Sequence, residues 1–211
     1  MRRRIAFLDV EPDERWSDQI DMFRAILSPH LQLDHFRVYK GDLPVLGEYD
    51  GAIICGSNEN IFPRPPPFVE PLIALIRECD GRSKFRIVGV CFGAQIIAHA
   101  LGGEVGMCET PVCGIVHMRF SKSMTTLLEI YGLDSSDCTI LSTHSQCIHR
   151  LPINSTILAS SLSTHHECFM TGRYHSMLGL QSHPEYTREV LKTRLGCEVP
   201  SFHEDNKCTV A

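Results

Sequence analysis

The feature that most constrains the fold is a short segment, Ile87–Gln95, in which an apolar strand-like run passes directly into an apolar helix-like run. The segment has the form Gly-x-Cys-x-Gly, with Gly89 two residues before Cys91 and Gly93 two residues after it. Such a sharp strand-to-helix turn strains the backbone and brings neighbouring segments close together, so both flanking positions must be small. We therefore predict a strand, an elbow at Cys91 and a helix in immediate succession.

The rest of the chain alternates short apolar runs with stretches of helical period, a pattern typical of α/β proteins. The predicted strands of the main sheet are Ile5–Leu8, Gly51–Cys55, Ile87–Cys91 and Met177–Leu180. The predicted helices are Trp16–Leu27, Pro71–Cys79 and Phe92–Leu101. Further strand-like runs without strong intervening helices are Ile115–Phe120, Cys138–Leu141, Thr156–Ala159 and Glu167–Met170. We expect an α/β fold with a mostly parallel central sheet flanked by helices and a smaller antiparallel extension.

Length and charge narrow the class of protein. A chain of 211 residues can bury one sizeable core, so we expect one active site. We assign residues 1–190 to one domain and residues 191–211 to a C-terminal tail, because the sequence after about Gly196 lacks periodicity. The net charge of −5 and the scattered basic residues argue against nucleic acid as a partner. No apolar run is long enough to span a membrane.

The number and spacing of the cysteines indicate the cellular compartment. The ten cysteines contain no Cys-x-x-Cys pair, and the chain is larger than the usual disulfide scaffold, so we expect reduced thiols and a cytoplasmic location. The last four residues, Cys208–Ala211, match the prenylation pattern loosely. Because Thr209 is not aliphatic and the preceding residues are not polybasic, we expect Cys208 to stay unmodified.

The elbow places Cys91 where a nucleophile could be activated. The helix dipole and the unpaired N–H groups of the first turn favour a thiolate, and a nearby imidazolium would favour it further. The alternative is an inert buried cysteine between two glycines. Gln95 lies in the first turn of the same helix and is placed to contact a substrate.

A second segment supplies a candidate base. The run that begins at Met177 ends in a polar cluster, with His183 followed two residues later by Glu185. Glu185 could hydrogen-bond one ring nitrogen of His183 and leave the other to exchange a proton with Cys91. The alternative, an ordinary surface strand end, does not explain why these residues occur together. We predict a catalytic triad of Cys91, His183 and Glu185.

The two segments, in this order, resemble class I glutamine amidotransferases, which carry a Gly-x-Cys-x-Gly-x-Gln elbow and a later His-Pro-Glu. The resemblance extends from about Ile5 to Tyr186 and includes Leu101-Gly102-Gly103 and Cys55-Gly56-Ser57. Within the family, the chain is most similar to the stand-alone group described as GMP-synthase-like, which includes plant γ-glutamyl peptidases.

The resemblance implies further site residues. It places the backbone N–H groups of Phe92 and of Ser57, or its neighbour Gly56, in an oxyanion hole, and it places His144 and Gln146 in the substrate loop. This loop reads His-Ser-Gln where the family often has His-x-Asp. Two other departures are Glu104, where a lysine is usual, and Ser182, where phenylalanine is common. These departures bear on specificity more than on catalysis.

The function that the resemblance implies is cysteine-dependent hydrolysis of γ-glutamyl amide bonds, in glutamine or γ-glutamyl peptides, through a γ-glutamyl thioester. This chemistry requires no metal and no organic cofactor. One alternative is a glutaminase subunit that supplies ammonia to a synthase partner. Another is a non-catalytic binding protein on the same fold.

One cluster suggests a metal site. The run His165-His166-Glu167-Cys168 contains four residues of ligand type, but adjacent histidines on a strand point to opposite faces. We therefore expect no metal there. The resemblance to the amidotransferases places this stretch before the catalytic histidine, near the α-amino end of the substrate, and so implies a modest role in specificity.

Overall fold

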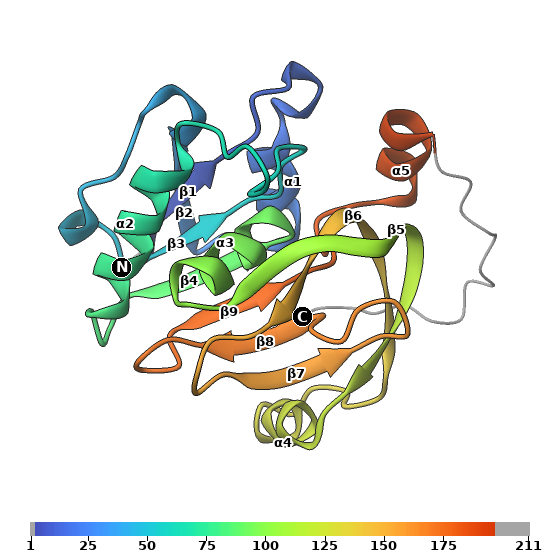
Figure 1. Cartoon of the computed structure of the whole chain (residues 1–211). Helices are drawn as coiled ribbons and strands as arrows, with labels where there is room; N and C mark the ends of the chain where they lie inside the picture. Colours follow the sequence, from blue (N-terminus) through green and yellow to red (C-terminus); the bar gives the residue numbers. More distant parts are fainter. Residues whose placement is uncertain (1–2, 197–211) are drawn as a thin grey trace.

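The computed structural model describes residues 3–196, which form a sheet of nine strands with helices packed on it (Figure 1). The strands are β1 (Arg3–Asp9), β2 (Leu31–Arg37), β3 (Gly51–Ile54), β4 (Arg86–Val90), β5 (Glu104–Phe120), β6 (Cys138–Arg150), β7 (Thr156–Ser160), β8 (Cys168–Thr171) and β9 (Met177–Leu180). The α-helices are α1 (Gln19–Ile26), α2 (Val69–Asp80), α3 (Phe92–Ala100), α4 (Lys122–Ile130) and α5 (Arg188–Leu195). Short 3-10 helices span Glu14–Trp16, Val38–Lys40 and Leu46–Glu48. The C-terminal residues from 197, including the prenylation pattern at Cys208, lie outside the described residues.

Half of the sheet is parallel, which confirms the predicted α/β fold. Strands β2, β1, β3, β4 and β9 are neighbours in this order and pair in parallel. Figure 1 shows α2 and α3 side by side on the near face of these strands. Central strands such as β3 are buried along their whole length, which explains their unbroken apolar sequence. The carboxyl ends of β3 and β4 meet at one edge, and the elbow lies there.

The antiparallel extension is larger than the sequence indicates. Strands β8 and β7 continue the sheet, and β5 and β6 form a long antiparallel hairpin at its edge, with α4 in the connection between them. Strand β5 pairs with β7 only at Arg119 and Phe120, whereas it pairs with β6 over Glu104–Met107 and again over Val112–Met118. Leu141 of β6 makes an isolated antiparallel bridge to His183. The hairpin thus returns to the edge of the parallel strands.

Several elements differ from the predictions for physical reasons. The hairpin strands were predicted as Ile115–Phe120 and Cys138–Leu141 only, because the inward residues of the remaining part of β6, such as Ser142, are polar. The predicted helix Trp16–Leu27 is divided, and α1 begins at Gln19. Strand β2 and helix α4 were missed, since β2 is a mixed-polarity edge strand and α4 has no fully buried residue. Helix α5 crosses residue 190, where the tail was predicted to begin.

The elbow depends on contacts that only glycine allows. A Cβ atom at Gly89 would meet the backbone of Gly93, and a Cβ atom at Gly93 would meet the backbone carbonyl of Ile54 in β3. Strands β3 and β4 and helix α3 therefore approach one another without a side chain between them. The predicted requirement for small residues around Cys91 has this origin. No helix within residues 3–196 is long and apolar enough to cross a membrane.

We predict that Gly93→Ala destabilises the protein, because the added methyl group overlaps the carbonyl of Ile54. Only a shift of β3 or of the elbow could relieve this overlap. The free energy of unfolding in urea should fall by about 1–3 kcal/mol, the range for overpacked cores. Gly47→Ala is the control, because a Cβ atom at this exposed position meets nothing within 4 Å. Equal stability of the two variants would contradict the packing described here.

Candidate active site

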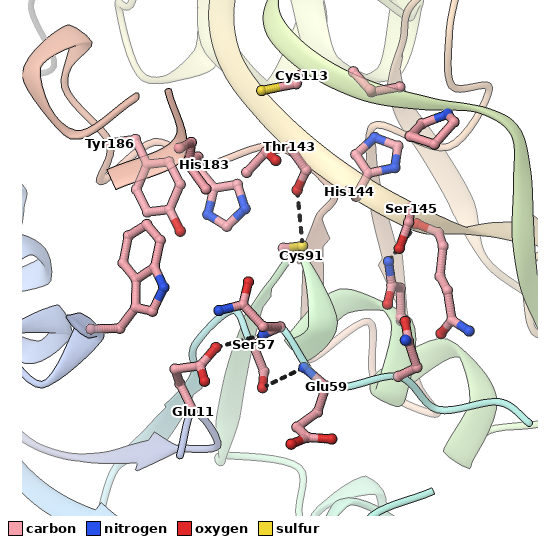
Figure 2. A pocket seen from close by; sticks show the side chains of 18 of the residues that line it. Glu11, Ser57, Glu59, Cys91, Cys113, Thr143, His144, Ser145, His183 and Tyr186 are labelled. Carbon is pink, nitrogen blue, oxygen red and sulfur yellow. Dashed lines mark hydrogen bonds between the residues drawn. The ribbon is translucent and has the colours of Figure 1, made fainter. Parts of the chain in front are cut away.

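A cavity of about 280 Å³ opens beside the elbow, at the carboxyl edge of the parallel strands. The loop after β3, the first turn of α3, the β5–β6 hairpin and the segment after β9 all contribute to its walls. Figure 2 shows Cys91 at its centre, with His183 and Thr143 on one side and Ser57 and Glu11 on the other. Segments that are far apart in the sequence thus meet around one thiol.

The backbone of Cys91 has the unusual conformation that the elbow requires. Its φ of 50° and ψ of −106° place it in a region that residues with a side chain rarely adopt. The N–H of Cys91 donates to the carbonyl of Leu180 in β9 at 2.7 Å, which ties the elbow to the neighbouring strand. Its Sγ lies 3.6 Å from the carbonyl oxygen of Thr143 in β6. The thiol is therefore held between the parallel sheet and the hairpin.

His183 and Glu185 lie where the sequence predicts that a base and its orienting group would lie. The N–H of His183 donates to the carbonyl of Leu141 at 2.8 Å, and Nδ1 of its ring is 2.8 Å from Oε1 of Glu185. Both side chains are buried. A Cβ atom at Gly56 would lie 2.8 Å from Cε1 of His183 and 3.6 Å from Cβ of Cys91. The imidazole and the thiol thus flank the same glycine, and the three predicted residues come together.

The charges around His183 favour its protonated form. Burial lowers the pKa of His183, but the carboxylate of Glu185 and the thiolate of Cys91 outweigh burial and raise this pKa to about 10. The imidazole of His183 is therefore protonated at neutral pH, next to the thiol of Cys91.

Aromatic rings stack on one face of the His183 imidazole. The ring of Tyr186 lies parallel to that of His183 at a centroid distance of 3.9 Å, and Trp16 stacks on Tyr186 at 5.2 Å. The guanidinium of Arg194 in α5 lies 5.2 Å from the Trp16 ring centroid and forms two short bonds to the carboxylate of Asp18, at 2.6 and 2.7 Å. Helix α5, whose residues from 191 onward were predicted as tail, therefore packs against the aromatic stack beside His183.

The residues predicted for an oxyanion hole lie beside the thiol. Phe92 is the first residue of α3, and the N–H of a first helical residue has no acceptor within its own helix. Ser57 lines the cavity, and its Oγ donates to the carbonyl of Val10 at 2.9 Å. Gly56 packs against His183, as described above. Their assignment as oxyanion donors stays a prediction.

The three predicted substrate-binding residues line the cavity wall, but their side chains also bond to the protein. Gln95 donates to the carbonyl of Gln146 at 2.7 Å, and the amide group of Gln146 donates to Phe62 at 2.7 Å and accepts from Ile61 at 3.1 Å. Gln146 therefore joins the hairpin to the loop after β3. His144 lies 3.3 Å from Sγ of Cys108, and burial together with the charge of His183 lowers the pKa of His144 to about 4.

Two buried polar residues of the site were not predicted. Glu11 accepts from the N–H groups of Asp13 and Asn58, at 2.9 and 2.5 Å, and burial raises its pKa. Gln19 donates to the carbonyl of Gly56 at 3.3 Å. The sequence could have indicated Glu11 as a site residue, since it is an acidic residue soon after the carboxyl end of a predicted strand. Nothing in the sequence marks Gln19 as a site residue, because it lies within a predicted helix.

Comparison with known proteins identifies the family. The family model of the class I glutamine amidotransferases matches residues 24–195. The chain belongs to this family. Among similar proteins, γ-glutamyl peptidase 4 of Arabidopsis thaliana is 30% identical over 165 residues, which are 76% of this chain and 64% of that peptidase. The glutamine-hydrolysing GMP synthase of Flavobacterium psychrophilum is 32% identical over 140 residues, which are 66% of this chain and 25% of the synthase.

Solved structures share the same amidotransferase fold. A glutamine amidotransferase from Thermotoga maritima superposes with a TM-score of 0.72 at 21% identity, over 88% of this chain and 77% of that protein. One from Methylobacillus flagellatus has a TM-score of 0.70 at 20% identity, over 89% and 72% of the two chains. The predicted fold class is thereby confirmed. The chain spans less than two thirds of the length of γ-glutamyl peptidase 4.

One departure from the amidotransferase pattern has a structural counterpart. Ser182 donates to Oε2 of Glu167 at 2.7 Å, and Ser161 donates to Oε1 at the same distance. The carboxylate of Glu167 thus supports the residue that precedes His183.

The two adjacent histidines of the cluster, His165 and His166, lie in the turn before β8, with ring centroids 4.9 Å apart. Because they do not lie on a strand, the expected alternation of strand side chains does not apply to them. Within residues 3–196, no group of three or more ligand-type side chains is placed to hold a metal.

We predict that iodoacetamide alkylates Cys91 of this amidotransferase before Cys55, Cys79, Cys108 and Cys168. Burial raises the pKa of Cys55 well above its usual range and the pKa of each of the other three to about 12, so these thiols stay protonated at neutral pH. Peptide mapping after short exposures would give the order of labelling. His183→Ala should slow the labelling of Cys91 because the imidazolium is lost. If any of these four cysteines were labelled before Cys91, the assignment of Cys91 as the activated thiol would be contradicted.

Proposed function

We propose that this chain hydrolyses γ-glutamyl amide bonds, with Cys91 as nucleophile, His183 as acid and base, and Glu185 as the group that orients His183. The observation that carries the proposal is that Cys91 and His183 line one cavity and that Nδ1 of His183 makes a buried bond of 2.8 Å with Glu185. The similarity to γ-glutamyl peptidases adds the class of substrate.

The proposed reaction begins with attack of the Cys91 thiolate on the side-chain carbonyl carbon of the γ-glutamyl group. The carbonyl oxygen becomes an oxyanion, which the N–H groups of Ser57 and Phe92 stabilise. The C–N bond then breaks, and His183 transfers its proton to the departing nitrogen. A γ-glutamyl thioester and a free amine result.

Hydrolysis of the thioester uses the same histidine as a base. Once Cys91 is acylated, it carries no charge, so one of the two groups that raise the pKa of His183 is lost. The neutral imidazole accepts a proton from water as the water oxygen attacks the thioester carbonyl. Collapse of the second tetrahedral intermediate releases glutamate and restores the thiolate. Glu185 holds the ring in one orientation throughout.

A second candidate function is a glutaminase subunit that supplies ammonia to a synthase partner. The observation in its favour is the similarity to GMP synthases, where the matched residues make up 25% of the longer relative. A non-catalytic binding role is the third candidate, and the assembled Cys91, His183 and Glu185 argue against it. These candidates differ in whether the isolated chain turns over and in which leaving group it accepts.

We predict that the isolated chain hydrolyses a γ-glutamyl dipeptide at least as well as glutamine, without another protein. The measurement is kcat/KM for both substrates, with Cys91→Ala as the inactive control, checked for folding by thermal unfolding. Removal of the nucleophile should lower kcat by at least about 10⁴-fold. Weak activity on every substrate, rising strongly when a synthase is added, would favour the ammonia-supplying subunit.

The raised pKa of His183 predicts the alkaline side of the pH profile. Because the protonated form persists above the ordinary value of about 6.5, kcat/KM should be retained well above that pH and fall as the pH rises towards about 10. Glu185→Gln removes a carboxylate that raises this pKa, so the fall should move to lower pH. Glu78→Gln, an exposed position on α2, is the control and should leave the profile unchanged. An unshifted profile in Glu185→Gln would contradict the assigned pairing.

A further inference from the structure

We propose that Gln19 is a positioning residue that fixes the peptide between Gly56 and Ser57 and thereby directs the N–H of Ser57 at the oxyanion. The inference rests on the proposed function, because it assigns a task to a residue at the same site. Gln19 is the first residue of α1, and its side chain is 3% exposed. Its Nε2 donates to the carbonyl oxygen of Gly56 at 3.3 Å.

The geometry of the peptide unit connects this bond to the oxyanion hole. A trans peptide is planar, so its C=O and N–H groups point in opposite directions. The carbonyl of Gly56 and the N–H of Ser57 belong to the same peptide. When Gln19 holds that carbonyl towards α1, the N–H of Ser57 must point away from α1. Rotation of this peptide would turn the N–H away from the oxyanion.

The position of this peptide explains why its orientation matters. Gly56 lies against both His183 and Cys91, so the peptide that follows it is next to the reacting atoms. The neighbouring parts of the loop are held by other bonds. Oγ of Ser57 donates to the carbonyl of Val10 at 2.9 Å, and the N–H of Asn58 donates to Glu11. Gln19 adds a bond at the carbonyl of Gly56, which holds the end of the loop that packs against His183 and Cys91.

The start of α1, where Gln19 lies, is tied to α5. The preceding residue, Asp18, forms two bonds with Arg194 of α5, at 2.6 and 2.7 Å. Oε1 of Gln19 is buried and accepts no hydrogen bond within the described part of the chain. A buried amide with an unused acceptor costs free energy, so its presence is explained better by the bond that Nε2 makes than by packing.

The test compares two reactions at Cys91 that differ in their need for an oxyanion hole. Iodoacetamide forms a thioether at Cys91 by displacement of iodide, with no carbonyl oxygen to stabilise. An activated ester, p-nitrophenyl acetate, acylates Cys91 through a tetrahedral oxyanion and releases nitrophenolate. Rates are measured for wild type, Gln19→Met and the control Gln32→Met, with the background from other thiols taken from Cys91→Ala. Gln32 is an exposed glutamine on β2 that bonds to Asp34.

We expect Gln19→Met to lower the acylation rate by at least about tenfold, since loss of a whole oxyanion donor costs about 100- to 1000-fold. Alkylation by iodoacetamide and the thermal midpoint should stay near the wild-type values, and Gln32→Met should match wild type in both reactions. With a γ-glutamyl substrate, kcat should fall while KM stays unchanged. Gln19→Glu, which keeps the size but replaces the donor, should behave in the same way if Gln19→Met does not fold.

Three results would overturn the proposal. Unchanged acylation would show that the peptide needs no support from Gln19. Equal losses in acylation and alkylation would indicate general damage to the site. A raised KM with unchanged kcat would make Gln19 a substrate contact. If wild type is acylated by the ester but does not turn over γ-glutamyl substrates, the proposed function fails while the comparison of the two reactions still tests Gln19.

Discussion

The close approach of β3, β4 and α3 is the constraint on which the rest of the site depends. Because Gly89 and Gly93 carry no side chains, the elbow packs directly on the backbone of Ile54, and Cys91 is forced to a φ of 50°. A conformation of this kind costs about 1–3 kcal/mol and persists only where the surroundings determine it. Here the surrounding strands supply that support, including the bond from Cys91 to Leu180. The strained conformation thus places the thiol of Cys91 at the cavity.

Burial of charge around the elbow follows from the same packing. His183 and Glu185 are both removed from water, which is costly unless the charges are paired and hydrogen-bonded. Their mutual bond provides the pairing, while Tyr186 covers the ring of His183 and Trp16 stacks on Tyr186, neither of which adds charge. Low exposure also strengthens each electrostatic interaction at the site. The site is therefore arranged around the buried pair of His183 and Glu185, with the thiol of Cys91 beside it.

The sequence predicted those parts of the structure in which local chemistry and burial agree. The elbow, the parallel strands and the segment from His183 to Glu185 were readable because glycine spacing, apolar runs and polar strand ends each have one main physical cause. The full length of the hairpin was not predicted, because β6 turns polar residues such as His144 inward to the cavity. Helix α5 was missed although Thr187 caps its start and Gly196 its end. The contact of Gln19 with Gly56 depends on tertiary structure, and no local pattern indicates it.

The central claim is that Cys91 forms a covalent γ-glutamyl intermediate, and its most direct test is to trap that intermediate. The protein is mixed with a γ-glutamyl anilide, quenched in acid within the first turnover and digested for mass spectrometry. One γ-glutamyl group should be attached to the peptide that contains Cys91, and hydroxylamine should remove it, as expected for a thioester. Glu185→Gln should slow the formation of this adduct without moving it to another residue. Product release with no adduct at Cys91, or an adduct at a different cysteine, would contradict the account.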